Sequence, residues 1–283
     1  MTLATTGALM GDAMRTGSAV IAFNVISLEH AEGIVAGLEN SGVPGILQIS
    51  ENAIGFHGGR LAPIVAACRE VAASATSSVA IHLDHVKDLE LARAGISDSW
   101  PLGVSSLMID AAHLDYEQNV AATAALAAEA HRTSLWVEAE LGEIGGKNGA
   151  HAPGVRTDPL EAASFVAETR VDGLAVAVGS SHAMTAATAE IDLDLIERLA
   201  EAVPVPLVLH GSSGVPVESL RDAVARGIRK INVGTALNVG YTNRIRESLA
   251  ADARMTDPRR YLAPARDAVT ELAANLSATL VAH

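Results

Sequence analysis

Short apolar runs rich in β-branched residues recur along the whole chain, and each is followed by a segment of helical length. We expect strands at residues 19–25, 45–50, 78–84, 106–110, 135–141, 173–180, 206–211 and 230–235. The intervening segments are rich in Ala, Leu and Glu, such as NVAATAALAAEAHR and DLDLIERLAEAV. Near-continuous apolar strands that alternate with helices are typical of a parallel sheet covered by helices.

Eight strand–helix units in 283 residues predict a single-domain (β/α)₈ barrel that spans residues 1–283. A doubly wound open sheet is the alternative, and it is disfavoured because no Gly-x-Gly-x-x-Gly turn follows the first strand. No low-complexity linker divides the chain. The final segment, DPRRYLAPARDAVTELAANLSATLVAH, is expected to be a loop followed by a closing helix.

Polar residues gather at the carboxyl ends of these strands. In a barrel the carboxyl ends meet at one mouth, where active sites form. The residues concerned are Asn24, Gln48, Ser50, His82, Asp84, His85, Asp110, Glu138, Glu140, Ser180, Ser181, His182, His210, Asn232 and Thr235. A surface without a site would have such residues at both ends, so the convergence predicts an enzyme.

Composition narrows the partners and the location. The formal net charge is −13 and Lys and Arg form no cluster, which makes nucleic acid and anionic membranes poor partners. The chain shows neither a signal-peptide pattern nor an apolar stretch of membrane-spanning length. The single cysteine, Cys68, excludes a disulfide within the chain and is expected to be an ordinary buried thiol in a helix. We expect a cytoplasmic protein.

Lysine is scarce, and its placement bears on mechanism. Lys87 and Lys147 lie in connections, and Lys230 is expected to open the eighth strand at the end opposite the mouth. A Schiff-base mechanism needs a lysine inside the barrel and is therefore not expected. A phosphate-bearing ligand would need a metal, backbone amides or an arginine instead.

Three histidines follow three different strands: His85, His182 and His210. Neutral imidazoles from separate strands can enclose a zinc ion and leave a position open to substrate. One such histidine alone would more often be a hydrogen-bonded surface residue, but the three together, with acidic groups at the same mouth, favour a metal site. The remaining histidines are expected to be structural, with His30 and His131 in helices, His57, His113 and His151 in loops, and His283 at the end of the chain.

Asp84 directly precedes His85. Period-two alternation would send the two side chains to opposite faces of a strand. A turn of the backbone at the strand's end would instead let Asp84 face a substrate while His85 binds the metal. The alternative role for Asp84 is to orient a metal-bound imidazole. Leu83 and His82 are expected to be supporting residues.

Two small-residue loops, LHGSSGV (209–215) and INVGTAL (231–237), follow the seventh and eighth strands. Small residues let backbone amides approach an anion closely, and a helix N-terminus favours negative charge. In barrels this is a recurrent phosphate position. We therefore expect these loops to bind phosphate.

A glycine-rich stretch, ELGEIGGKNGAHAPGVRTDPLEA, covers residues 140–162 and is either a mobile lid or a disordered surface loop. At its end, Asp158 and Glu161 resemble a capping box, with Pro159 at the first helical position. A helix is therefore expected to start there.

Several segments in fixed order resemble the class II, zinc-dependent ketose-bisphosphate aldolases. They are AFNV, ILQIS, IHLDH, SLMIDAAHLDYEQN, WVEAELGEIGG, AVGSSHA, LVLHGSSGV, INVGT and DPRRYLAPAR, and together they span nearly the whole chain. The resemblance implies a TIM barrel that reversibly cleaves a ketose 1,6-bisphosphate to dihydroxyacetone phosphate and an aldehyde. Fructose bisphosphate is the first candidate substrate, and tagatose bisphosphate or another phosphorylated ketose is the alternative.

The resemblance also assigns roles to residues. It implies one zinc ion held by His85, His182 and His210, and Asp84 as the catalytic acid/base. Asp110 and Glu140 match acidic positions near an alternative metal location. Residues matching the phosphate end of the substrate site are Gly211, Ser213, Asn232 and Thr235, to which we add the strand-end residues Asn24 and Ser50. A homodimer or homotetramer and a monovalent cation near the phosphate are further implications.

The chain departs from the family pattern at two places. Ala183 follows His182 where many members have glycine, and Met184 and Thr185 follow where Tyr-Lys is common. Lys147 and Asn148 stand where acidic residues often follow the paired glycines. These departures concern the phosphate cradle and the proton donor.

Two other classes of function remain open. A metal-dependent barrel hydrolase would use zinc to activate water, but the first strand lacks the His-x-His pair of the commonest arrangement. A noncatalytic sugar-phosphate-binding barrel would not need an acid/base such as Asp84. Release of dihydroxyacetone phosphate discriminates among the three.

Overall fold

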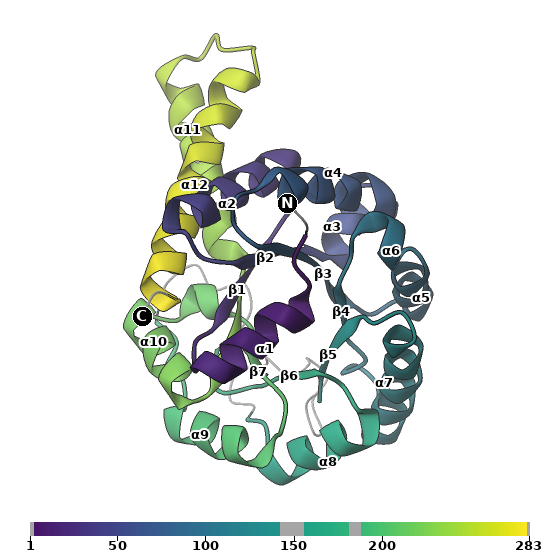
Figure 1. Ribbon diagram of the computed structural model, residues 1–283. Coiled ribbons are helices and arrows are strands. Elements are labelled where there is room, and N and C mark those ends of the chain that lie inside the picture. Colours follow the sequence, from purple (N-terminus) through teal and green to yellow (C-terminus); the bar gives the residue numbers. More distant parts are fainter. Residues whose placement is uncertain (1–2, 142–155, 181–187, 282–283) are drawn as a thin grey trace.

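The computed structural model describes residues 3–141, 156–180 and 188–281, and its centre is a closed barrel of eight parallel strands (Figure 1). The strands are β1 (Val20–Asn24), β2 (Gly45–Ser50), β3 (Val79–Val86), β4 (Ser106–Ile109), β5 (Trp136–Glu140), β6 (Gly173–Ala175), β7 (Leu207–Leu209) and β8 (Ile228–Val233). β1 closes the barrel by pairing with β8, where Ile21 lies opposite Ile231. The predicted (β/α)₈ barrel is confirmed, and the open sheet is wrong.

Helices fill the connections and surround the barrel. They are α1 (Thr6–Thr16), α2 (Leu28–Ser41), α3 (Glu51–Phe56), α4 (Leu61–Ser74), α5 (Leu89–Ser97), α6 (Ser99–Leu102), α7 (Tyr116–His131), α8 (Pro159–Thr169), α9 (Leu193–Ala202), α10 (Val217–Arg226), α11 (Thr235–Ala251) and α12 (Arg259–Leu280), with a 3₁₀ turn η1 (Ser212–Gly214). The predicted closing helix is α12. None of the helices in the described ranges combines the length and apolar character needed to span a bilayer.

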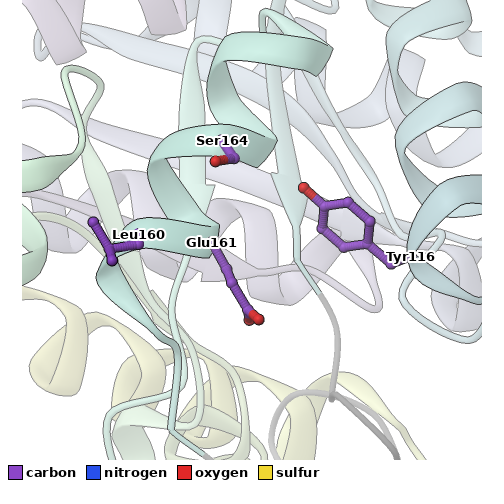
Figure 2. Close-up of a pocket in the computed structure, with 4 residues that line it drawn as sticks. All are labelled: Tyr116, Leu160, Glu161 and Ser164. Atoms are coloured by element: carbon purple, nitrogen blue, oxygen red, sulfur yellow. The ribbon is translucent and has the colours of Figure 1, made fainter.

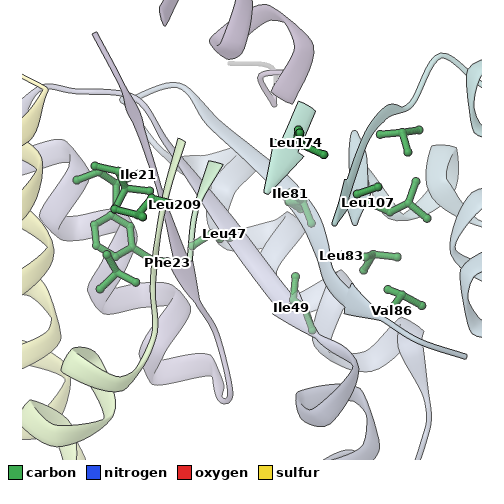
Figure 3. Packing of buried hydrophobic residues seen from close by; sticks show 14 of the residues in the cluster. Ile21, Phe23, Leu47, Ile49, Ile81, Leu83, Val86, Leu107, Leu174 and Leu209 are labelled. Atoms are coloured by element: carbon green, nitrogen blue, oxygen red, sulfur yellow. The ribbon is translucent and has the colours of Figure 1, made fainter. Parts of the chain in front are cut away.

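The strands bury their outward faces against the helices. Ile21 and Phe23 of β1, and Ile81 and Leu83 of β3, are fully buried in this outer layer (Figure 3). Cys68 of α4 joins the same layer, and burial raises the pKa of its thiol to about 12, as expected of an inert core cysteine. Burying one aliphatic side chain contributes about 1.5–3 kcal/mol, so this layer is the main source of stability.

A second apolar cluster fills the lower half of the barrel interior. α1 lies across the amino-terminal end of the barrel, where its Leu9, Met10 and Ala13 form a floor (Figure 1). The inward strand residues that pack on this floor are Val20, Ala22, Ile46, Ala80, Met108, Trp136, Ala175 and Val208. With this end closed, the polar interior positions lie toward the carboxyl ends of the strands.

The last two long helices, α11 and α12, form a hairpin that projects beyond the barrel (Figure 1). α12 packs closely on α2, because a Cβ atom at Gly37 would lie 2.7 Å from the Cβ atom of Ala273. Arg266 of α12 also pairs with Glu32 of α2 at 2.8 Å. In α11, by contrast, Leu237 is the buried residue, so the outer part of the hairpin contributes little to the core.

One strand boundary changes the interior. β8 begins at Ile228, before the predicted start, so Lys230 lies within the strand and is fully buried in the barrel. Arg229 points the other way, and its Nη1 donates to the backbone oxygens of Val224 and Ile228 at 2.8 and 2.9 Å. Lys230 was expected to open the strand at the end opposite the mouth, but as the third residue of β8 its side chain faces the interior. The expectation that no strand interior holds a lysine is wrong.

Candidate active site

The inward faces of several strands change from apolar to polar toward their carboxyl ends. In β3 the inward series runs from Ala80 to His82 to Asp84, because alternate residues share a face. In β5 it runs from Trp136 to Glu138. The structure brings together part of the predicted set, namely Asn24, Asp84, His85, Asp110, His210 and Asn232. His82 and Glu138, however, lie deeper than a mouth position and are fully buried.

The end of β3 places two adjacent side chains at the mouth. His85 has a positive φ of 49°, in the left-handed region, and the pairing register between β3 and β4 breaks between Leu83 and Val86. A non-glycine residue in this region costs about 1–3 kcal/mol and is held by its surroundings. The irregularity cancels the alternation that would separate Asp84 from His85. The predicted turn of the backbone is confirmed.

His85 and His210 face each other across the mouth. Nε2 of His85 lies 2.9 Å from Nδ1 of His210, and the ring centroids are 4.7 Å apart. Nδ1 of His85 donates to Oδ2 of Asp110 at 2.9 Å. Burial alone would lower the pKa of His85, but the charge of Asp84 and the hydrogen bond to Asp110 outweigh it and raise the pKa to about 9. One proton between two facing nitrogens therefore holds the pair together.

These residues fit a metal ion. The ligand atoms of Asp84, His85 and His210 all lie within 4.8 Å of one another. The carboxylates that favour a proton on His85 would equally favour a cation between the imidazoles. Asp110 contacts His85 here, and its predicted place at an alternative metal position, shared with Glu140, stays a prediction. The third predicted ligand, His182, lies outside the described residues, as do Ser181, Ala183, Met184, Thr185, Lys147 and Asn148.

Two side-chain amides hold the Asp84 carboxylate. Nδ2 of Asn24 donates to Oδ2 at 2.9 Å, and Nδ2 of Asn232 donates to Oδ1 at 3.4 Å. Gln48 fixes the orientation of Asn24, because its Nε2 donates to Oδ1 of Asn24 at 2.8 Å. A Cβ atom at Gly234 would lie 2.7 Å from that same oxygen. Glycine at this position therefore leaves room for the Gln48–Asn24–Asp84 chain.

The loops after β7 and β8 meet at the start of α11. Oγ of Ser213 accepts a hydrogen bond from the backbone N–H of Ala236 at 3.1 Å, and Ser212 donates to the backbone oxygen of Asn232. Gly211 has a φ of 68°, which lets the chain turn directly after β7. Thr235 is the first residue of α11. The predicted phosphate loops thus lie beside a helix N-terminus, a favourable place for an anion.

Two predicted positions next to the mouth act as helix caps. Oγ of Ser50 accepts from the backbone N–H of Ala53 at 3.2 Å and caps α3. Asp158 caps α8, with Pro159 as its first residue, so the predicted helix start is confirmed. Most of the preceding glycine-rich stretch, residues 142–155, lies outside the described residues. A substrate contact for Ser50 stays a prediction.

A surface pocket lies between α7 and α8, outside the barrel (Figure 2). It is lined by Tyr116, Leu160, Glu161 and Ser164. None of these belongs to the predicted site, and the phenol of Tyr116 donates to Glu168 at 3.3 Å rather than facing a reactive group. The pocket contributes no chemistry to the mouth.

Glu138 and Gln48 were expected only as members of the polar mouth, and Lys230 only as the start of the eighth strand, but the structure connects all three to the site. Nζ of Lys230 donates to Oε2 of Glu138 and to Oδ1 of Asn232, each at 2.8 Å. Spacing by two residues could have revealed Glu138 and Lys230, because Glu138 shares a strand face with Glu140, and Lys230 shares one with Asn232.

Comparison with known proteins gives the chain a family. The family model described as fructose-bisphosphate aldolase class-II matches residues 4–282. A protein of Geobacillus stearothermophilus named fructose-bisphosphate aldolase is 36% identical over 273 residues, covering 95% of this chain and 93% of that protein. A probable fructose-bisphosphate aldolase of Bacillus subtilis (strain 168) is 37% identical over 267 residues, covering 93% of this chain and 92% of that protein.

A solved structure shows the same architecture. The YdjI aldolase from Escherichia coli K12 superposes with a TM-score of 0.83 at 29% sequence identity, covering 99% of this chain and 97% of that chain. The likeness in fold therefore extends along the full barrel and not only over the segments that carry the candidate site.

We expect His85→Ala, His182→Ala and His210→Ala each to lose bound zinc, because each removes one predicted ligand. The measurement is zinc per chain by elemental analysis after dialysis. His131→Ala is the matched control, since that imidazole bonds Asp172 at 2.8 Å on the outside of the barrel and should leave zinc unchanged. Full zinc occupancy in all three ligand variants would show that the metal binds elsewhere.

Proposed function

Because the chain belongs to the class-II fructose-bisphosphate aldolase family, we propose that it reversibly cleaves a ketose 1,6-bisphosphate, with fructose bisphosphate first. The products are dihydroxyacetone phosphate and glyceraldehyde 3-phosphate. Tagatose bisphosphate or another phosphorylated ketose is the alternative substrate. The observation that carries the proposal is the meeting of Asp84 with the facing imidazoles of His85 and His210 beside a helix N-terminus.

Zinc, a family requirement, would be held by His85 and His210 together with His182. When bound it supplies a Lewis acid that stabilises the negative charge left on the dihydroxyacetone phosphate half. Asp110 supports this arrangement by fixing Nδ1 of His85, so that Nε2 faces the metal position. We propose one ion per chain, and a monovalent cation beside the phosphate stays a prediction.

Asp84 would act as the general base in the cleavage direction. Its carboxylate accepts the proton of the C4 hydroxyl, the C4–O bond becomes a carbonyl, and the electron pair of the C3–C4 bond passes to the other half. In condensation Asp84 returns the proton. Asn24 and Asn232 contribute by holding the carboxylate in one orientation, which is a positioning contribution.

The phosphate of the dihydroxyacetone phosphate half would lie at the start of α11. Gly211, Ser213 and Thr235 are close to the backbone amides there, and the helix dipole favours the anion. Both lysines of the described connections and strands are otherwise engaged, since Lys87 approaches Asp110 and Lys230 is paired inside the barrel. Backbone amides are therefore the natural phosphate donors.

We further propose a homodimer or homotetramer with one barrel domain, residues 1–283, in each subunit. The projecting α11–α12 hairpin supports this, because Val239 and Leu249 of α11 are exposed. A cytoplasmic location is proposed as well, and the one cysteine, buried and unpaired, is consistent with it.

A substrate panel tests the activity. Phosphorylated ketoses of both C4 configurations are incubated with the zinc-loaded protein, and dihydroxyacetone phosphate is measured with a coupled dehydrogenase. Release from fructose bisphosphate at the highest kcat/KM is the expected result. Release of inorganic phosphate in place of dihydroxyacetone phosphate would favour a hydrolase, and zinc retention without turnover of any ketose would favour a binding protein.

Asp84→Ala tests the general base. Loss of a positioned base costs on the order of 10²–10⁴ in rate, so kcat should fall by such a factor. Zinc per chain should stay at the parent level, because the imidazoles remain. If Asp84 instead orients a metal ligand, zinc affinity should fall roughly 10–100-fold. Rescue of activity by excess zinc would therefore contradict the acid/base role.

Chelators should abolish activity, and borohydride added with substrate should trap no adduct. The reason differs from the one expected from the sequence, because a lysine does lie inside the barrel. The ammonium of Lys230 is buried and donates to Glu138 and Asn232, so it is engaged as a cation. Mass spectrometry of the treated protein decides the matter, and a substrate adduct on Lys230 would contradict this mechanism.

A further inference from the structure

An ion pair lies at the centre of the barrel, directly beneath the metal position. Glu138, Lys230 and His210 are each fully buried. Oε2 of Glu138 accepts from Nζ of Lys230 at 2.8 Å, and Oε1 accepts from Nε2 of His210 at 2.8 Å. One carboxylate therefore joins a buried cation to a predicted zinc ligand.

The contact with Glu138 determines which nitrogen His210 offers to the mouth. A carboxylate only accepts hydrogen bonds, so Nε2 of His210 must carry the proton. The lone pair of the neutral ring is then on Nδ1, the atom that faces His85 at 2.9 Å. Without an acceptor at this place the ring could carry its proton on either nitrogen, and one of the two tautomers cannot bind a metal through Nδ1.

Lys230 determines the orientation of a second group. Its Nζ donates to Oδ1 of Asn232 at 2.8 Å, which leaves Nδ2 of that amide on the side of Asp84, 3.4 Å from Oδ1 of that carboxylate and 3.2 Å from Nε2 of His210. The same ammonium offsets the charge of Glu138, whose burial would otherwise be unfavourable. Lys230 therefore contacts Glu138, the partner of His210, and also the amide of Asn232, which holds Asp84.

We propose that Glu138 and Lys230 are positioning residues, with Glu138 fixing the tautomer of His210 for zinc binding and Lys230 fixing Glu138 and the amide of Asn232. This inference rests on the proposed function. Neither residue touches the substrate. The alternative is that the pair only fills the barrel core.

Two double variants separate these roles without leaving an unpaired buried charge. E138M/K230M removes both charges and the acceptor for His210, whereas E138Q/K230M removes both charges but keeps a side-chain oxygen that can accept from Nε2. Mutation of a residue that hydrogen-bonds a metal ligand typically weakens metal affinity by roughly 10–100-fold. The zinc dissociation constant, measured by competition with a chromophoric chelator, should rise by about that factor in E138M/K230M. It should lie much closer to the parent value in E138Q/K230M.

A control variant and two further measurements test whether Glu138 and Lys230 only fill the barrel core. Ser106→Ala is the control, because Ser106 is buried in the same interior but bonds Thr6 and His82 instead of a predicted ligand. Its zinc affinity should match the parent, and the metal-free melting temperature of each variant reports on folding. Nitrogen-15 NMR of the metal-free proteins should show the Nε2–H form of His210 in the parent and a tautomer mixture in E138M/K230M.

The proposed effect of Lys230 on Asn232 is tested by kcat. At saturating zinc, E138Q/K230M should show a lower kcat than the parent, because Lys230 no longer orients the amide beside Asp84. Equal zinc affinity in the parent and E138M/K230M would overturn the role of Glu138, and an unchanged kcat in E138Q/K230M would overturn that of Lys230. Failure of the parent itself to bind zinc would instead overturn the proposed function.

Discussion

The buried ion pair between Glu138 and Lys230 constrains the whole interior of this barrel, because neither charge contacts water. Breaking a buried ion pair by removing one partner costs about 3–5 kcal/mol, a large part of a typical folding stability of about 5–15 kcal/mol. A substitution of Glu138 or Lys230 alone would therefore leave the charge of the other residue buried and unpaired. Their neighbour His82 must stay neutral, and burial together with the charge of Lys230 lowers its pKa well below the ordinary value.

The pair also marks the boundary between two halves of the barrel. Below it, the inward side chains are mostly apolar, Ser106 being a polar exception that bonds Thr6 of α1, and the floor formed by α1 closes the barrel. Above it, the inward side chains are the amides, carboxylates and imidazoles of the mouth. The outward faces of the same strands pack on the helices along their full length. Stability and chemistry are thus separated by strand face and by depth, which is how this fold accommodates a polar site without weakening its core.

Much of this arrangement can be predicted from the sequence, because hydrophobic periodicity follows directly from the period of a strand. The order of strands, the closing helix and the polar mouth were predicted in this way. The shorter β6 and β7 were not, since the apolar runs continue past Ala175 and Leu209 although the ladder pairing ends there. Sequence pattern records burial, whereas a strand's end is set by backbone pairing.

Two features of the site depend on details that a pattern of residue types does not contain. The left-handed backbone at His85 is a single φ angle, and a histidine is compatible with several. The burial of Lys230 depends on where β8 begins, and a shift of one residue exchanges its face with that of Arg229. The sequence is compatible with either Lys230 or Arg229 facing the interior, and the pairing of β8 with β7 and β1 selects Lys230.

The two imidazoles show why geometry adds to a motif match. Asp110 accepts a hydrogen bond from Nδ1–H of His85, so the lone pair of that ring is on Nε2. Glu138 accepts one from Nε2–H of His210, so the lone pair of that ring is on Nδ1. Opposite nitrogens therefore converge on one point. The difference follows from depth, because His85 reaches in from the irregular end of β3 near the rim while His210 is fully buried beside the ion pair. A set of three histidines gives the identity of the ligands, but the partners behind each ring decide which atom can bind.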